Sequence, residues 1–204
     1  MNSPVAHSGA PPYELSVDGF SHFRVHTFTG KETISEAYSF EIVVTAHARG
    51  DEAIERGALG QRATFVWNVG KSPRAFHGVL AAVQLAGVHD VRESQKLRMR
   101  LVPRLWLLKR RKRTRIFQNM RVPDVVTAVL LEAGIAAKWQ LLHDYPVREY
   151  CTQYEESDYR FITRLLAEAG IYFYFPAGPP SATITSPHRP SPQPARSWRP
   201  SRSP

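Results

Sequence analysis

Two histidines are the first side chains in this sequence with the chemistry of metal ligands. His22 and His26 lie four residues apart in the segment HFRVH, so on a strand they would share one face. A zinc site needs further nitrogen, sulfur or carboxylate ligands, and none follows at a spacing that would complete the set. The sequence therefore favours solvated or capping histidines over a metal centre.

The single cysteine, Cys151, is a candidate nucleophile. It lies between Tyr150 and Thr152 in a segment that alternates like a strand, and no histidine or asparagine accompanies it in a recognisable arrangement. A catalytic thiol needs such a base, so we interpret Cys151 as a small structural residue. One cysteine cannot form an intramolecular disulfide and is compatible with a reducing cytosol.

Three acidic side chains, Glu155, Glu156 and Asp158, are spaced closely enough to suggest general acid–base chemistry of the kind glycosidases use. Their position at the start of a predicted helix explains them more simply, because negative charge is stabilised by the helix macrodipole there. The sequence has no GxSxG, HExxH or phosphate-binding glycine loop. We therefore predict no catalytic, cofactor-binding or metal-binding residue, no cofactor, and no enzyme activity.

A basic run, Lys109–Arg115 (KRRKRTR), has six cations in seven residues. Such a run can bind nucleic acid, an anionic membrane or an acidic protein surface. No aromatic residue interleaves with the charges, so stacking on single-stranded nucleic acid is unsupported. We interpret the run as a solvated connector between two structural units. The alternative is a small basic binding protein that uses Lys109–Arg115 and an arginine-rich tail on an acidic partner.

The net charge of +9 is concentrated in few places. The basic run and four arginines after Phe175 account for it, and the rest of the chain is close to neutral. A dedicated nucleic-acid-binding protein has a broad basic face, which this distribution does not indicate. No apolar stretch is long enough to cross a membrane, and residues 1–12 lack the basic start and apolar run of a signal peptide. We expect cytoplasmic synthesis.

The elements that must position these residues form two groups. Residues 13–108 contain about six strand-like segments separated by turns, which predicts an antiparallel β-barrel. Residues 109–175 predict a small α+β subdomain with two helices. Pro123 starts the first and Gly134 ends it, whereas Ser157 caps the second and Gly170 ends it. The expected fold class is mainly β with an α+β part.

The two ends of the chain differ in composition from this body. Residues 1–12 are small, polar and proline-containing, and we expect a disordered leader. Residues 176–204 contain nine prolines and six serines among 29 residues, which predicts a disordered tail. The abrupt change at Pro176 is interpreted as a shift of the reading frame or a truncation of the gene, and a native Pro/Arg-rich tail is the alternative.

Two long segments carry a resemblance to a known family. REYCTQYEESDYRFITRLLAEAGIYFYF (Arg148–Phe175) and RIFQNMRVPDVVTAVL (Arg115–Leu130) resemble, in the same order, segments of the VgrG family, the spike proteins of bacterial type VI secretion. The similarity runs from about Tyr13 to Phe175. It implies a module like the late control D or baseplate hub proteins of phage tails, which are trimeric and join the spike to the inner tube.

In the VgrG family the hub continues beyond the point where this similarity stops. A small β-barrel and an intertwined β-helical needle follow it, and neither is present in these 204 residues. The resemblance therefore implies a truncated hub fragment that is structural and not catalytic. Its expected partners are two further copies of itself and the inner-tube and baseplate proteins, and it would be exported by the type VI machine if functional.

Overall fold

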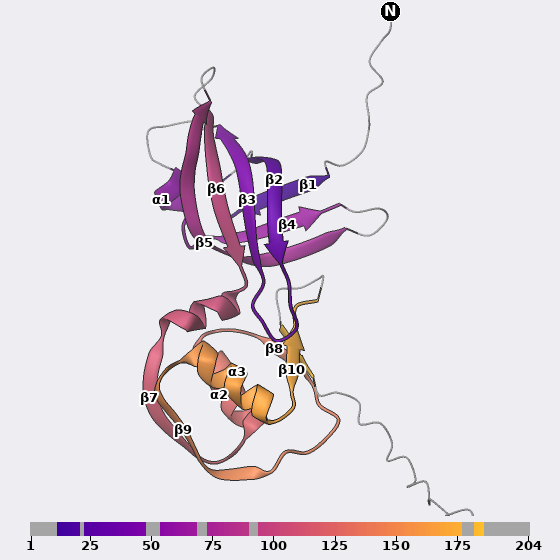
Figure 1. Ribbon diagram of the computed structural model, residues 1–204, viewed down its shortest axis with the longest axis vertical. Helices are drawn as coiled ribbons and strands as arrows, with labels where there is room; N and C mark the ends of the chain where they lie inside the picture. Colours follow the sequence, from indigo (N-terminus) through magenta and orange to yellow (C-terminus); the bar gives the residue numbers. More distant parts are fainter. Residues whose placement is uncertain are drawn as a thin grey trace, which may run out of the picture.

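A curled β-sheet forms the N-terminal unit of the protein, and two helices ringed by strands form the unit beneath it (Figure 1). The computed structural model describes residues 12–20, 23–47, 54–68, 73–89, 94–176 and 182–185. None of the helices in these ranges has the length and apolar character that crossing a bilayer requires.

Six antiparallel strands make the curled sheet, in the order β1-β4-β5-β6-β3-β2. They are β1 (Tyr13–Val17), β2 (Phe23–Lys31), β3 (Ser39–His47), β4 (Arg62–Trp67), β5 (Arg74–His89) and β6 (Ser94–Val102). The two edge strands approach each other, and the rings of Tyr13 on β1 and Phe28 on β2 meet at 5.2 Å. The antiparallel barrel predicted from the sequence is thus confirmed as an open, curled half-barrel.

Strand β5 produces much of the curl. It is 16 residues long, and its first part pairs with β4 while its longer second part pairs with β6. The register with β6 shifts between Leu80 and Ala82, and such bulges bend and twist a strand. Gly78 lies just before this bend, where a β-carbon would come within 2.0 Å of the carbonyl oxygen of Val102. Any side chain at this position would collide with the neighbouring strand, so the bend requires glycine.

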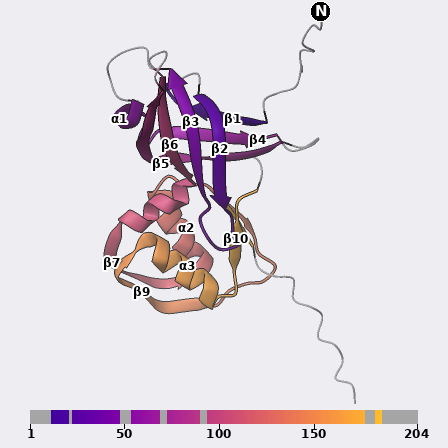
Figure 2. The same cartoon turned by 45° about the horizontal axis from the view of Figure 1, so that its top comes forward.

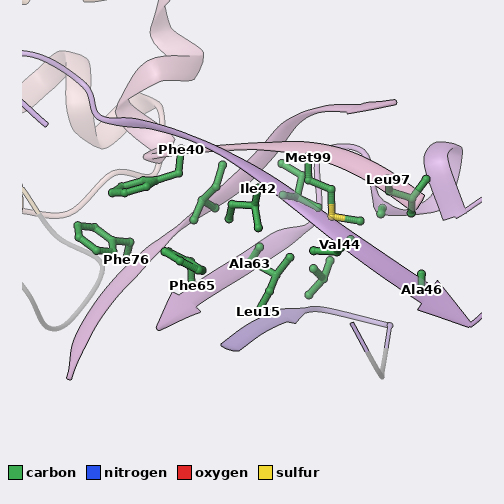
Figure 3. Packing of buried hydrophobic residues seen from close by; sticks show 14 of the residues in the cluster. Leu15, Phe40, Ile42, Val44, Ala46, Ala63, Phe65, Phe76, Leu97 and Met99 are labelled. Atoms are coloured by element: carbon green, nitrogen blue, oxygen red, sulfur yellow. The ribbon is translucent and has the colours of Figure 1, made fainter. Parts of the chain in front are cut away.

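The core of the half-barrel follows the period-two alternation of its strands (Figure 3). On β6, Leu97 and Met99 point inward and are fully buried, whereas Arg98 and Arg100 are exposed. Aromatic rings fill the end nearest the second unit, with Phe40 and Phe76 4.4 Å apart. The short helix α1 (Ile54–Ala58) adds its two buried terminal side chains to this core.

The sixth strand ends at Val102, short of residue 108, where the predicted β-barrel ends. Pro103 cannot donate to the sheet, and the chain continues as a 3-10 helix, η1 (Arg104–Arg110). In a 3-10 helix, residues three apart lie on one side, and this places Leu105 and Leu108 together in the core of the second unit.

The second unit contains helices α2 (Val122–Glu132) and α3 (Asp158–Glu168). Its strands are β7 (Lys112–Arg121), β8 (Ala137–Gln140), β9 (Val147–Ser157), β10 (Tyr172–Tyr174) and β11 (Ala182–Thr185). Strands β7 and β9 form an antiparallel ribbon, and β10, β11 and β8 form a small sheet in that order. Two leucines and an isoleucine of α3 are buried among valines of α2, as the helical spacing predicts.

The ends of both helices agree with the sequence-based prediction. Ser157 caps α3, and its hydroxyl accepts a hydrogen bond from the backbone N–H of Arg160 at 3.2 Å. Gly134 and Gly170 follow the two helices with φ values of +62° and +67°, in the left-handed region that glycine enters without a steric cost.

Strand β11 differs from the expectation of a disordered stretch beginning at Pro176. Ile184 and Thr183 are 3% and 4% exposed, and the strand pairs with both β10 and β8. The proline and serine content of the stretch conceals the local sequence ATIT, whose β-branched residues favour a strand. The predicted leader up to residue 11, and the tail after Thr185, lie outside the described residues.

The two units are joined at a second place besides η1. The loop between β2 and β3 reaches down to the second unit (Figures 1 and 2). There the N–H of Ser35 donates to the carbonyl of Phe173 at 2.8 Å, and the N–H of Ala37 donates to the hydroxyl of Tyr159 at 3.0 Å. The ring of Phe175 packs against both cores and meets Tyr38 edge-on at 5.0 Å.

Candidate functional site

Asp158 is the centre of an ion-pair cluster built from the basic run. Its carboxylate is 1% exposed and accepts a hydrogen bond from Arg115 at 3.1 Å. Arg111 and Arg113 lie 3.5 and 3.8 Å from its other oxygen. The backbone N–H of Asp158 also donates to the carbonyl of Arg111, which fixes the start of α3 against the start of β7.

Two further side chains complete the cluster. Gln153, fully buried on β9, donates to Asp158 at 2.9 Å and accepts from Arg115 at 2.8 Å. Glu132, at the end of α2, pairs with Arg113 and Arg115 at 2.9 Å each. A buried charge is tolerated only when it is paired and hydrogen-bonded, and among the described residues no buried polar side-chain atom lacks a partner.

The interpretation of Lys109–Arg115 as a solvated connector is therefore wrong. Its first residues end η1 and the others begin β7, and three of its six cations are held by internal carboxylates. Lys109 lies 4.7 Å from the ring centre of Tyr159, and Arg110 lies 5.8 Å from that of Trp106. Lys109, Arg110 and Lys112 are exposed, whereas the three arginines that pair with Asp158 face into the fold. Only half of the run's cations are therefore available to an acidic partner, and the alternative of a small basic binding protein is not favoured.

The other two carboxylates of the acidic segment have different surroundings. Glu156 accepts from Arg164 of α3 at 2.6 Å, and Arg164 also pairs with Glu168 at 3.0 Å. Hydrogen bonds from Arg148 and Arg164 lower the pKa of Glu168. Glu155 is exposed, and its backbone N–H donates to the hydroxyl of Thr114. These contacts bind strands to a helix and do not present an acid and a base to a common cavity.

Cys151 is buried on the inner face of β9, opposite Phe117 of β7. Burial raises the pKa of its thiol, although Arg148 acts in the opposite direction. A raised pKa reduces the thiolate fraction, and the thiolate is the reactive form. The position agrees with the structural role expected from the sequence.

Of the two histidines weighed as metal ligands, His22 lies outside the described residues. His26 is on β2, and its Nε2 is 2.6 Å from the hydroxyl of Thr45 on the neighbouring strand. Within the described ranges, no three His, Cys, Asp or Glu side chains come together in a way that could hold a metal ion. The prediction of no metal site stays a prediction.

Sequence reasoning missed the cluster, although part of its signal was present. Arg111, Arg113 and Arg115 alternate with other residues, and positions two apart share one face of a strand. Three cations on one inward face require a buried counter-charge, which is Asp158. The register that sets Arg115 opposite Gln153 is a tertiary feature, and no local pattern indicates it.

The curled sheet followed by an α+β unit matches a known protein family. The family model described as phage tail baseplate hub (GPD) matches residues 31–195. The chain belongs to the phage tail baseplate hub family. The match covers strands β3 to β11, which include four of the six strands of the half-barrel and all of the second unit, and it extends beyond Phe175, where the sequence resemblance stops.

Individual relatives of this hub chain are spike proteins. The type VI secretion system spike protein VgrG4b of Pseudomonas aeruginosa is 39% identical over 168 residues, which cover 80% of this chain and 20% of the relative. The solved structure of the E. coli c3393 protein is described as a component of the type VI secretion system, similar to the T4 bacteriophage tail proteins gp27 and gp5. It superposes with a TM-score of 0.74 at 29% identity, over 84% of this chain and 48% of c3393.

A 43 kDa prophage tail protein from Shewanella oneidensis shares the fold alone. Its TM-score is 0.60 at 15% identity, over 85% of this chain and 52% of that protein. The hub chain spans about a fifth of the length of the curated spike proteins it matches.

Proposed function

We propose that this chain is a structural, non-catalytic hub module of a type VI secretion spike. The observation that carries the proposal is the family match over residues 31–195, which includes most of the half-barrel, the second unit and the joint between them. The similarity to VgrG4b and c3393 supports placement in a secretion spike rather than in a phage tail. The buried ion-pair cluster supports a structural role, because its charged groups face one another within the fold.

In this role the module assembles with two further copies and contacts the inner-tube and baseplate proteins. The machine then exports it with the spike. Since the chain spans about a fifth of its relatives, the needle and barrel functions would belong to parts that these 204 residues do not contain.

The proposal is tested by exchanging the module within a relative. Residues 13–185 of this chain, from β1 to β11, replace the matching segment of VgrG4b, and the release of inner-tube protein into the medium is measured. We expect release close to that of unmodified VgrG4b, whereas VgrG4b lacking the segment gives none. A chimaera that is soluble and abundant but supports no release would contradict the proposal.

Light scattering coupled to size-exclusion chromatography tests the assembly of the isolated chain. The proposed role places three copies of the module together, so we expect self-association at low micromolar concentration. A monodisperse monomer would favour an independent domain of two units instead.

A further inference from the structure

A cavity of about 400 Å³ lies at the joint between the two units. Pockets that bind small molecules measure about 300–1,000 Å³ and are common between domains. Its described walls come from β4 and β5, from Asp18 after β1 and Tyr38 before β3, from the start of η1 at residues 103–105, from the turn after α2, and from the segment that follows β10. The cavity shares no residue with the ion-pair cluster around Asp158.

Aromatic rings form the apolar part of the cavity. Tyr38 and Phe76 are 2% and 4% exposed, and their rings meet edge-on at 5.8 Å. Phe175 completes the wall and packs on Tyr38. The Tyr38 hydroxyl donates to the carbonyl of His77, and burial raises the pKa of Tyr38, so this wall carries no charge at neutral pH. Such a wall suits one planar ring, because aromatic pairs favour edge-to-face and offset contacts.

Two arginines supply the polar part. Arg62 and Arg104 both line the cavity, and neither forms an ion pair with a described carboxylate. Asp18 is the one acidic side chain among the described lining residues, and its N–H donates to the carbonyl of Arg62. The lining therefore keeps a net positive charge. A guanidinium binds a carboxylate through two parallel hydrogen bonds.

The surroundings of Arg104 leave room for a ligand. Gly134 borders the cavity, and the position of a β-carbon built on it lies 3.7 Å from the Arg104 guanidinium, so glycine leaves space beside the charge. On β5 and β4, His77 and Thr64 also line the cavity, and Nδ1 of His77 is 3.0 Å from the hydroxyl of Thr64. These two side chains add polar groups to the lining.

We propose that this cavity binds an aromatic carboxylate, with the ring against Tyr38 and Phe175 and the charge on Arg104. A free aromatic acid and the carboxyl-terminal aromatic residue of a polypeptide have this chemistry in common. Because the walls belong to both units, the bound ligand contacts both and strengthens the joint.

The test is an NMR titration of the full chain with N-acetyl-L-phenylalanine and, separately, its amide. The amide has the same shape without the charge. We expect saturable shifts of the Gly78 and Gly134 backbone signals with the acid, and at least fivefold weaker binding of the amide. Arg104→Gln weakens binding of the acid at least fivefold, while Arg98→Gln, at an exposed site on β6, leaves it unchanged.

A second variant tests the cavity without altering its charge. Ala136 is exposed at the cavity, so Ala136→Trp fills the space while the fold is kept, and binding should be lost. Equal binding of acid and amide, binding that survives Ala136→Trp, or no saturable shift at either glycine would overturn the proposal. The peptide Gly-Gly-Phe and 3-phenylpropionate then separate the two sources: binding of either supports the site, and binding of neither overturns it.

Discussion

Replacing Asp158 by asparagine removes the charge at the centre of the cluster while keeping its shape. The new amide places a donor where Arg111 and Arg113 also present donors. A hydrogen bond to a charged group contributes about 1.5–3 kcal/mol, and removing one partner of a buried ion pair costs about 3–5 kcal/mol. Arg115 is 18% exposed and keeps Glu132, which lowers the loss. We expect the free energy of unfolding to fall by about 2–4 kcal/mol.

Urea denaturation followed by circular dichroism measures this loss against a matched control. Asp124 is an exposed acidic residue in the first turn of α2, as Asp158 is the acidic residue in the first turn of α3. Asp124→Asn therefore removes a comparable interaction with a helix macrodipole without disturbing an ion-pair cluster. It should cost under about 1 kcal/mol. Raising the salt to about 1 M should leave most of the difference between the variants, because buried pairs are screened little. Equal, small losses in both would refute the assignment of a stabilising cluster to Asp158.

Three further outcomes are expected. In urea denaturation, Leu165→Ala should lower the free energy of unfolding by about 2–5 kcal/mol, because this leucine is fully buried. Arg164→Ala should lower it by under about 1 kcal/mol, because this arginine belongs to a surface network of ion pairs. Similar losses in both variants would mean that the buried face of the helix is misassigned. Removing residues 176–204 should lower the melting temperature by roughly 5–10 °C, because the deletion removes the buried side chain of Ile184 from the second core. An unchanged melting temperature would contradict the packing of β11. The lowered pKa of Glu168 gives stability that is complete above the ordinary value of 4.5 and is lost as the pH falls through the folded-state value. Glu168→Gln should therefore flatten the acid limb of the urea midpoint below about pH 5, and an unchanged limb would count against the pairing.

The parts of the fold that depend on near neighbours were predictable from the sequence. The helix that Ser157 caps and Gly170 ends is an example, because capping and left-handed glycine are properties of a few adjacent residues. The alternation in β6 likewise indicated which side chains are buried. The end of that strand before Pro103 was not predicted, because the 3-10 helix that follows depends on the second core.

The parts that depend on distant pairing were not predictable. Strand β11 forms because it lies parallel to β8, more than forty residues earlier in the chain, and its composition gave no sign of this. The environment of Asp158 depends in the same way on the register between β7 and β9. From the sequence alone the residue could be assigned only to a helix start. The cavity at the joint has walls from both units, and no single segment of the sequence indicates it.

The loop between β2 and β3 has a mechanical consequence. A single covalent link at Pro103 would act as a pivot, and the half-barrel could swing about it. The hydrogen bonds of Ser35 and Ala37 to the second unit form a second attachment, away from the first. Because the two units are attached at two separate places, the half-barrel cannot rotate about the Pro103 link without breaking those hydrogen bonds. A force applied to one unit is therefore transmitted to the other unit and does not bend the joint.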